Sequence, residues 1–291
     1  MWAYMLSGPC ILGAVEVTAP APHDLAKGQV WLATRAGGIC GSDMPRLRGA
    51  PFTHPKKRGG MVTRAPGFPM HEIVGEVIAS AHPAHDIGDL VVGWASDFDG
   101  IAELVVSDGD GLSPYDTRLS PTVAVMLQPL SCVLYAAEQI GDVRGQAVAV
   151  VGQGPTGLLF SHVLKSRGAA HVTGVDPVDR SEASGVFAVD EVVTATAGSW
   201  SLSLTESERP SLVVEAVGHQ VSTMKNCLEA LAFGGQVFYF GVPDDLIHPF
   251  DMMIFLRKKL TLRSGTTMER RRVCRPLTTT LANIPNYARL T

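Results

Sequence analysis

Apolar and polar positions alternate in two different ways along the chain, and the change comes between about Pro114 and Ser120. Before it, short β-like runs such as EIVGEVIAS and DLVVGWAS are separated by Gly, Pro and Asp. Such runs predict an irregular, mostly antiparallel β domain. After it, apolar strand-like runs alternate with segments of helical spacing, beginning with AVAVVG at Ala147–Gly152. This second pattern predicts a parallel sheet covered by helices on both faces, and therefore an α/β protein.

Domain boundaries follow from this change of pattern. We expect a mostly β domain over residues 1–128 and a doubly wound parallel sheet over residues 129–266. The apolar segment between them, SPTVAVMLQPLSCVLYAAEQIG, predicts two helical pieces interrupted at Pro129. The stretch Arg48–Pro69 is rich in Pro, Gly and basic residues, which predicts a long loop.

Composition and charge narrow the functional classes. With 291 residues, of which 46% are hydrophobic and 18% charged, the chain is long enough for two domains with cores of their own. A net charge of −4 argues against nucleic acid or an anionic membrane as a partner. No apolar run reaches the roughly 18–20 residues that span a bilayer, and the N-terminus does not resemble a signal peptide. Five scattered cysteines without a Cys-x-x-Cys pair argue against a disulfide framework, so we expect a cytoplasmic protein.

A glycine-rich turn follows the first strand of the predicted parallel sheet. In VVGQGPTGLLF, Gly152 makes the tight turn, Gly154 lets the backbone approach a pyrophosphate, and Gly157 lets the helix pack against the strand. The helix that opens at Pro155 presents free N–H groups and a positive dipole end to the phosphates. Asp176 ends the next strand, where its carboxylate can accept a hydrogen bond from a ribose 2′-OH. These features predict a dinucleotide site.

The identity of the dinucleotide depends on two side chains. An acidic residue at the position of Asp176 favours NAD, because its carboxylate repels the 2′-phosphate of NADP. Arg180 follows soon after in the sequence and leaves NADP as the alternative.

The first half of the chain carries candidate metal ligands. Cys40 lies in the stretch GGICGSD, and His71 and Glu72 are adjacent in PMHEIVGEV. A thiolate, an imidazole and a carboxylate form a set suited to Zn²⁺, and a catalytic zinc keeps one position open for substrate. If the His–Glu segment is an extended strand, only one of its two side chains faces the metal unless the backbone twists there. This favours His71 as the direct ligand and leaves Glu72 as a group that supports the ligands or as a ligand in some states only. Each residue alone also fits a simpler interpretation, a core cysteine or a surface His–Glu pair.

Six motifs occur in order along nearly the whole chain: GGICGSD, HEIVGEV, PLSCVLYAAEQIG, VAVVGQGPTGLL, EAVG and GGQVFYFGVP. Together they resemble the medium-chain zinc-dependent alcohol dehydrogenases, especially the polyol and threonine dehydrogenase-like branch. The resemblance implies a GroES-like catalytic domain beside a Rossmann domain. It implies that Cys40 and His71 hold one catalytic zinc, with Glu72 adjacent. It also implies that Ser42 takes the substrate proton and that Asp43 orients the metal ligands.

The resemblance extends to the cofactor and to assembly. It implies dinucleotide contacts from the glycine-rich turn and from the ends of later strands, at Gly152, Gly154, Pro155, Thr156, Gly157, Asp176, Arg180, Val217, Gly218 and Gly241. Members of the family self-associate through the edge strand of the Rossmann sheet, which implies a homodimer or homotetramer.

Departures from the family pattern bear on activity. Pro45 stands where many relatives carry the histidine that passes the proton to solvent, and Met70 replaces a glycine beside the metal ligand. Gln128 replaces a glutamate, so its neutral amide oxygen is a weaker candidate ligand for the metal. The four-cysteine lobe of a structural zinc is absent, so we expect at most one zinc. Residues 267–291 correspond to the start of a return to the catalytic domain, beyond which the family's chain normally continues.

Three functions are compatible with these residues. The leading interpretation is a zinc-dependent dehydrogenase that transfers a hydride between a secondary alcohol or polyol, or the matching ketone, and NAD(H). A catalytically weak nucleotide-binding protein is the first alternative, and Pro45, Met70 and Gln128 fit it. The second is a metal-free NADPH-dependent quinone or enone reductase. Relatives of that kind usually lack the Cys and the His–Glu pair together.

Overall fold

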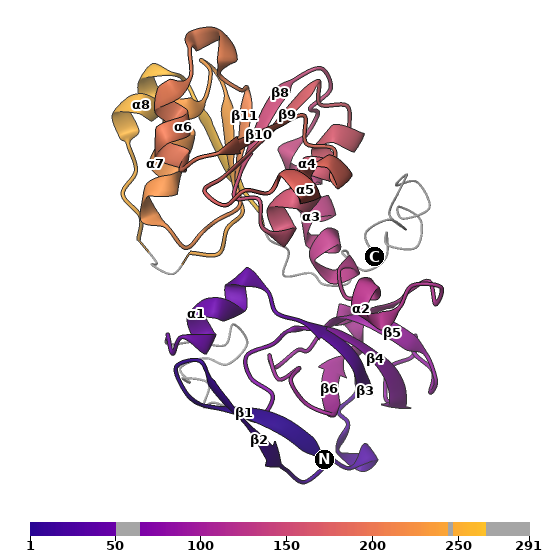
Figure 1. The fold of residues 1–291 in the computed structure, drawn as a ribbon. Coiled ribbons are helices and arrows are strands. Elements are labelled where there is room, and N and C mark those ends of the chain that lie inside the picture. The colour runs from indigo at the N-terminus through magenta and orange to yellow at the C-terminus, as the bar shows by residue number, and fades with distance from the viewer. Residues whose placement is uncertain (51–64, 244–246, 266–291) are drawn as a thin grey trace. The chain divides into compact units, whose positions relative to one another are not determined.

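The computed structural model describes residues 1–50, 65–243 and 247–265 (Figure 1). Within them the chain forms two compact units, which meet in the sequence between Ser131 and Cys132. The domain boundary expected from the sequence, between Gln128 and Pro129, lies in the same helix, α3 (Leu127–Ile140). The predicted segment 267–291 lies outside the described residues, and so does most of the loop predicted at Arg48–Pro69.

A five-stranded antiparallel sheet forms the centre of the first unit, and its strand order is β6-β3-β4-β5-β7. The strands are β3 (Gln29–Gly38), β4 (Glu72–Ser80), β5 (Leu90–Trp94), β6 (Leu104–Asp108) and β7 (Leu112–Pro114). A hairpin of β1 (Trp2–Gly8) and β2 (Ile11–Glu16) forms a second, two-stranded sheet. The mostly antiparallel β structure predicted for this part of the chain is confirmed.

The pairing of β3 with β4 brings distant parts of the sequence together. Fully buried Val30 and Leu32 of β3 and Ile73 and Val77 of β4 belong to one hydrophobic cluster, which holds the two strands in register. In that register Gly38, the last residue of β3, pairs with Glu72, the first residue of β4. The turn that follows β3 and the segment that precedes β4 therefore lie at the same end of this strand pair.

The second unit contains a six-stranded parallel sheet with the order β10-β9-β8-β11-β12-β13. Its strands are β8 (Ala147–Val151), β9 (His171–Asp176), β10 (Glu191–Thr194), β11 (Leu212–Glu215), β12 (Gln236–Tyr239) and β13 (Thr261–Ser264). The chain proceeds outward from β8 to β10 and then returns to the other side of β8 for the last three strands. This is the doubly wound Rossmann order, so the predicted fold class is confirmed.

Helices cover both faces of this parallel sheet. In Figure 1, α4 (Pro155–Ser166) lies on one side, and α6 (Ala197–Ser203) and α7 (Val221–Ala230) lie on the other. The segment Val148–Val151 of β8 is consequently buried on both faces. Burial of both faces explains why the run AVAVVG is apolar throughout instead of alternating. The short helices α5 (Ser181–Val186) and α8 (Met252–Arg257) complete the unit.

The helical segment that connects the two units differs from its prediction. Its break lies at Val125 and Met126, between α2 (Pro121–Ala124) and α3, and Pro129 lies in the first turn of α3. A proline there removes no intrahelical hydrogen bond, because the first N–H groups of a helix have no partner.

Contrary to the expectation that no apolar run is long enough to span a bilayer, Pro121–Ile140 is long and apolar enough to cross a membrane by length and composition. However, 61% of its apolar 18-residue window is buried inside the protein, as in the core helix of a globular domain.

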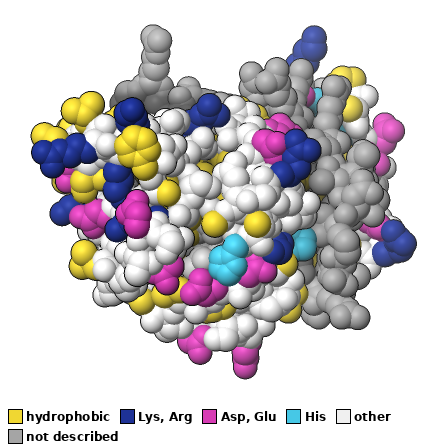
Figure 2. Space-filling view, turned by 90° about the horizontal axis from the view of Figure 1, so that it is seen from above, with side chains coloured by type: hydrophobic (Ala, Val, Ile, Leu, Met, Phe, Trp, Pro, Cys, Tyr) yellow, Lys and Arg dark blue, Asp and Glu magenta, His cyan; other side chains and the backbone are white. Residues whose placement is uncertain are grey.

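Charged side chains are mixed on the face that Figure 2 shows. Basic and acidic side chains both occur among the described residues drawn there, and neither sign forms a continuous area across the face. This mixed distribution among the described residues of one face agrees with the net charge of −4.

Candidate metal centre and dinucleotide loop

Cys40 lies in a tight turn that begins where β3 ends. Its backbone N–H donates a hydrogen bond to Oδ2 of Asp43 at 3.0 Å, and the N–H of Asp43 donates to the carbonyl oxygen of Cys40 at 3.0 Å. These two bonds close the short 3-10 helix Gly41–Asp43, in which Ser42 is half-buried. The turn fixes the backbone that carries the Cys40 sulfur and buries the Asp43 carboxylate completely.

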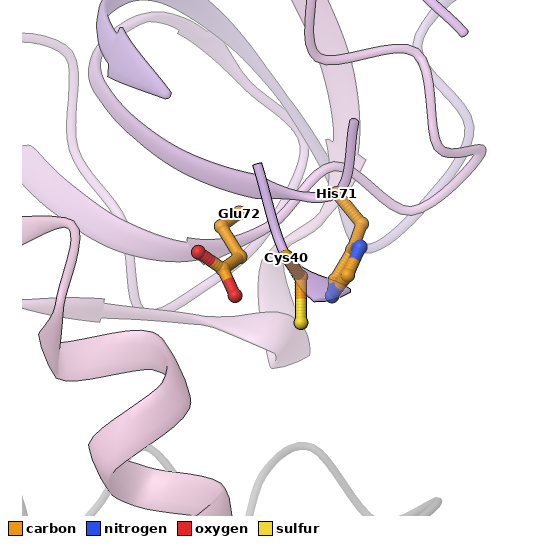
Figure 3. Close-up of side chains that lie close together, drawn as sticks. All are labelled: Cys40, His71 and Glu72. Carbon is orange, nitrogen blue, oxygen red and sulfur yellow. The ribbon is translucent and has the colours of Figure 1, made fainter. Parts of the chain in front are cut away.

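His71 and Glu72 reach the same place from the start of β4. One ligand atom from each of Cys40, His71 and Glu72 lies within 4.8 Å of the other two, and the three side chains converge in Figure 3. The expectation that only one of the two faces the metal held for an extended strand, and that condition is not met at His71. The strand begins only at Glu72, and the alternation of side chains holds within a strand but not across its end.

Two glycines at the end of β3 make room for this arrangement. A Cβ atom on Gly38 would lie 2.3 Å from Oε2 of Glu72, so any larger residue there would displace the carboxylate. A Cβ atom on Gly37 would lie 2.0 Å from Cε of Met70, and Gly100 also lies close to that methyl group. Met70, which departs from the family pattern, is thus buried in the space left by Gly37 and Gly100.

Asp43 determines which nitrogen of His71 is available to a ligand. Oδ1 of Asp43 lies 2.9 Å from Nδ1 of His71, so Nδ1 carries the proton of this hydrogen bond and Nε2 remains for a metal. Nη1 of Arg46 donates to the same Asp43 oxygen at 3.3 Å. The guanidinium of Arg46 also lies 4.6 Å from the ring centroid of Phe98, whose ring contacts His71. The sequence analysis missed Arg46, and no motif in the sequence marks it.

The charges around His71 set its protonation in the metal-free protein. Burial by itself would lower the pKa of His71, but hydrogen bonds and charges from Asp43 and Cys40 outweigh burial and raise that pKa to about 10. For Glu72 burial acts in the other direction, because it disfavours the charged carboxylate, and it raises the pKa of that group. The neighbouring His71 opposes this rise. A metal ion that binds here takes the place of the His71 proton.

The donor set fits a zinc ion. A cysteine sulfur, a glutamate oxygen and one nitrogen of a histidine whose other nitrogen is held by a carboxylate match the ligand types of zinc sites.

Two further residues from the sequence analysis lie in the same unit. Gln128 is buried in the first turn of α3, three residues beyond Val125, whose side chain lies beside Gly38. Pro45 is half-buried in the helix α1 (Met44–Leu47) and carries no group that can transfer a proton.

In the glycine-rich turn of the second unit, the backbone geometry shows why glycine occupies these positions. Gly152 has φ of +91°, in the left-handed region that favours glycine. A Cβ on Gly157 would lie 1.7 Å from the carbonyl oxygen of Gly152, so only glycine allows α4 to approach β8 this closely. A Cβ on Gly154 would meet nothing within 4 Å. Gly154 therefore leaves open space at the N-terminus of α4, where Pro155 and Thr156 form the first turn.

Asp176 is bonded to the same turn. Its Oδ2 accepts a hydrogen bond from the N–H of Gln153 at 2.8 Å, and its Oδ1 accepts one from Val178 at 2.8 Å. Each carboxylate oxygen can accept a further bond, so both retain capacity for a ribose hydroxyl. Arg180 precedes α5, and within the described part of the chain its buried Nε has no hydrogen-bond partner.

Gln153 has a structural role that the sequence analysis did not assign. Its side chain is almost completely buried; Nε2 donates to the carbonyl oxygen of Val150 at 3.1 Å, and Oε1 accepts from Ser161 at 3.3 Å. A Cβ on Gly174 of β9 would lie 2.8 Å from this side chain. The glycine inside the apolar strand HVTGVD was the available signal, because a glycine within a strand often marks a close approach.

The remaining predicted cofactor residues lie together at the ends of β11 and β12. A Cβ on Gly218 would lie 2.4 Å from the carbonyl carbon of Gly241, and a Cβ on Gly241 would lie 2.1 Å from the nitrogen of Gly218. Val217 contacts the turn at Gly152, since its Cγ2 lies 2.8 Å from the position of a Cβ there. The structure thus brings all three turns, after β8, β11 and β12, into one group.

Comparison with known proteins agrees with this geometry. The zinc-binding dehydrogenase family matches residues 155–283. D-altritol 5-dehydrogenase of Agrobacterium fabrum is 30% identical over 281 residues, covering 85% of this chain and 79% of that protein. L-idonate 5-dehydrogenase of Escherichia coli, named as using NAD(P)⁺, is 25% identical over 79% of this chain and 74% of its own length.

Solved structures share the fold. The alcohol dehydrogenase of Thermus sp. ATN1 superposes with a TM-score of 0.79 at 24% identity, covering 99% of this chain and 91% of that one. The structure of L-idonate 5-dehydrogenase from Escherichia coli gives a TM-score of 0.73 at 21% identity, covering 96% of this chain and 87% of that one. With the altritol dehydrogenase similarity over most of both chains, these findings show that this protein belongs to the medium-chain zinc-dependent alcohol dehydrogenase family and is an oxidoreductase.

Proposed function

We propose that this protein transfers a hydride between a secondary alcohol or polyol, or the matching ketone, and NAD(H), with one catalytic zinc. The observation that carries the proposal is the convergence of Cys40, His71 and Glu72, whose ligand atoms lie within 4.8 Å of one another. A metal-free quinone or enone reductase has no use for such a set. The two polyol dehydrogenases described above support a polyol as the substrate class.

In this proposal Cys40 and His71 hold the zinc. Glu72 is a third ligand, and Gln128 a weaker candidate because its amide oxygen is neutral. When bound there, zinc supplies Lewis-acid chemistry that makes an alcohol easier to deprotonate. Asp43 holds the Nδ1 proton of His71, so that Nε2 keeps its lone pair toward the metal.

Proton transfer begins at Ser42. Its Oγ would accept the hydroxyl proton of the alcohol while its own hydrogen passes on, and a bound nicotinamide would supply the acceptor for the hydride on the carbon that bears the hydroxyl group, so that a ketone results. Pro45 has no titratable group and cannot pass the proton on. The proton would therefore leave Ser42 through water or, with the cofactor bound, through a ribose hydroxyl.

The cofactor is held by the turn Gly152–Gly157 and by the residues grouped with it. The open space at Gly154 and the free N–H groups at the start of α4 suit a pyrophosphate. Asp176 favours NAD, because its carboxylate accepts from a ribose hydroxyl and repels a 2′-phosphate. Arg180, with an unpaired buried nitrogen in the described part of the chain, is the residue through which NADP would be accepted instead.

The first unit in this proposal is the catalytic domain and the second is the nucleotide-binding domain. We further propose a cytoplasmic homodimer or homotetramer. The five cysteines without a Cys-x-x-Cys pair fit a reducing compartment.

The test combines metal analysis with NAD-dependent oxidation of a polyol panel by the purified protein. We expect about one zinc per chain, and we expect Cys40→Ser to lose both the zinc and the turnover. The matched control is Cys10→Ser, because Cys10 is an exposed free cysteine of the same unit. Retained zinc with full turnover in Cys40→Ser contradicts the proposal. NADH binding without zinc and without turnover on any alcohol or ketone would instead identify a nucleotide-binding protein.

A further inference from the structure

A buried carboxyl group lies at the end of β11, and none of the roles described above involves it. Glu215 is the last residue of that strand and is 0% exposed. Its Oε1 accepts hydrogen bonds from the backbone N–H of Gly218 at 3.0 Å, from that of Val217 at 3.2 Å, and from the hydroxyl of Thr223 at 2.8 Å. Its Oε2 also accepts from Gly218, at 3.2 Å. A buried carboxyl group is costly unless such donors surround it, so its presence calls for a reason.

The hydrogen bonds of Glu215 determine the path of the chain after β11. They turn the backbone back on itself at Val217 and Gly218, and Gly218 has a φ of +70°. The carbonyl oxygen of Glu215 accepts in addition from Phe240 at 2.9 Å and from Gly241 at 3.0 Å. The side chain thus holds the turn after β11, while the backbone of the same residue holds the turn after β12.

These turns form one packed group with the glycine-rich turn. Ala216 donates its N–H to the carbonyl oxygen of Val151 at 2.9 Å, and Val217 packs on Gly152. Backbone atoms of Gly218 and Gly241 approach so closely that neither position has room for a Cβ. The Glu215 residue thus bonds directly to the turns after β11 and β12, which adjoin the glycine-rich turn at the carboxyl end of the sheet, where nucleotides bind in this fold.

The strand order places Glu215 in one half of that nucleotide site. Strands β8, β9 and β10 form the first half of the sheet, and β11, β12 and β13 form the second, with the reversal between β8 and β11. In a doubly wound sheet each half binds one mononucleotide. The Gly152–Gly157 turn and Asp176 belong to the adenosine half, so Glu215 belongs to the nicotinamide half.

A purely structural role as a helix cap does not account for these contacts. Thr223 lies in α7, but Val217 and Gly218 come before that helix, which begins at Val221. Two of the three groups that donate to Glu215 are therefore parts of the turn itself.

We propose that Glu215 is a positioning residue that holds the turn Ala216–Gly218, together with Gly241, in the shape that receives the nicotinamide half of the cofactor. This inference rests on the proposed function, since it presupposes NAD(H) binding. It adds a residue that supports Val217, Gly218 and Gly241 without itself touching the cofactor.

The test compares NADH with AMP, which represents the adenosine half alone, by fluorescence and calorimetric titration of the full chain. In Glu215→Leu the N–H groups of Val217 and Gly218 lose their acceptor, so we expect NADH to bind at least about tenfold more weakly. AMP should bind as in the wild type, because the first half of the sheet is unchanged. Glu215→Gln keeps one acceptor oxygen and should bind NADH within about threefold of the wild type.

The outcomes separate this inference from the proposed function. A wild-type protein that binds neither NADH nor NADPH refutes the proposed function. A wild type that binds NADH together with a Glu215→Leu variant that binds NADH equally well refutes the positioning role. An equal weakening of NADH and AMP also refutes it, because that result indicates a general loss of structure. If Glu215→Leu does not fold, Thr223→Val is used: a selective loss of NADH affinity supports the role, and no loss refutes it.

Discussion

Oδ1 of Asp43 lies 2.9 Å from Nδ1 of His71, and both groups are buried. This contact joins the turn after β3 to the residue before β4, and it leaves Nε2 as the imidazole nitrogen that a metal can bind. A carboxylate on the second nitrogen makes a histidine a better metal ligand and prevents its ring from rotating. The relationship between these two residues is thus the structural basis for the proposed zinc site.

Replacing Asp43 by Asn should weaken the zinc site. The amide can still contact Nδ1 but carries no charge, so we expect zinc affinity to fall about 10- to 100-fold. Competition with a chromophoric chelator measures this affinity, and circular dichroism checks the fold. The control Asp116→Asn removes an exposed ion pair of the same unit and should leave zinc affinity unchanged. Unaltered zinc affinity in Asp43→Asn would show that the contact does not serve a metal.

Gly38→Ala tests whether the absence of a side chain at Gly38 serves the metal site. The added methyl group would lie 2.3 Å from Oε2 of Glu72, so the carboxylate must move away from Cys40 and His71. We expect loss of bound zinc with retention of the folded sheet, measured by metal analysis and thermal unfolding. Gly13→Ala is the matched control in β2, because a Cβ there meets nothing within 4 Å. Full zinc content in Gly38→Ala would contradict a ligand role for Glu72.

The two glycines of the dinucleotide turn should respond differently to the same change. In Gly157→Ala the methyl group meets the backbone oxygen of Gly152, which cannot yield, so we expect about 1–3 kcal/mol of destabilisation. In Gly154→Ala the methyl group enters open space, so stability should stay within about 0.5 kcal/mol while NADH affinity falls. Urea unfolding and NADH titration measure the two effects. Wild-type NADH affinity in Gly154→Ala would show that the ligand does not use this space.

Glu215 predicts a pH dependence of stability. Burial raises the pKa of its carboxyl group above the ordinary value of 4.5 in spite of the bonds from Gly218 and Thr223. The folded protein therefore holds this proton more tightly than the unfolded chain, and the group lowers stability as pH rises from about 4.5 through the folded-state pKa. Glu215→Gln cannot ionise, so its stability relative to the wild type should improve over that pH range.

Urea unfolding at a series of pH values measures this difference in the free energy of unfolding. The control is Ser203→Ala, which leaves every titratable group of the same unit in place. A difference between Glu215→Gln and the wild type that stays constant with pH would mean that the pKa of Glu215 is the same in the folded and unfolded states.

The candidate site was predictable from the sequence where local rules apply. The turn Gly152–Gly157 was found because a strand, three glycines and a helix follow one another within a short stretch, and each has a local conformational reason. Cys40, His71 and Glu72 were found because their chemistry is distinctive. Their convergence, however, depends on the pairing of β3 with β4, which joins segments more than thirty residues apart.

By itself the sequence determined the change from a mostly β half to alternating strands and helices and the chemical types available, because periodicity and turn residues act over a few positions. Tertiary structure alone decided that His71 and Glu72 face the same point, since that depends on where β4 begins. It also decided that Met70 fits against Gly37, that Gln153 is buried against Gly174, and that Glu215 holds the turn after β11. Each of these is a contact of close packing or of a buried hydrogen bond. Such contacts are set by the three-dimensional approach of separate segments, which no local pattern records.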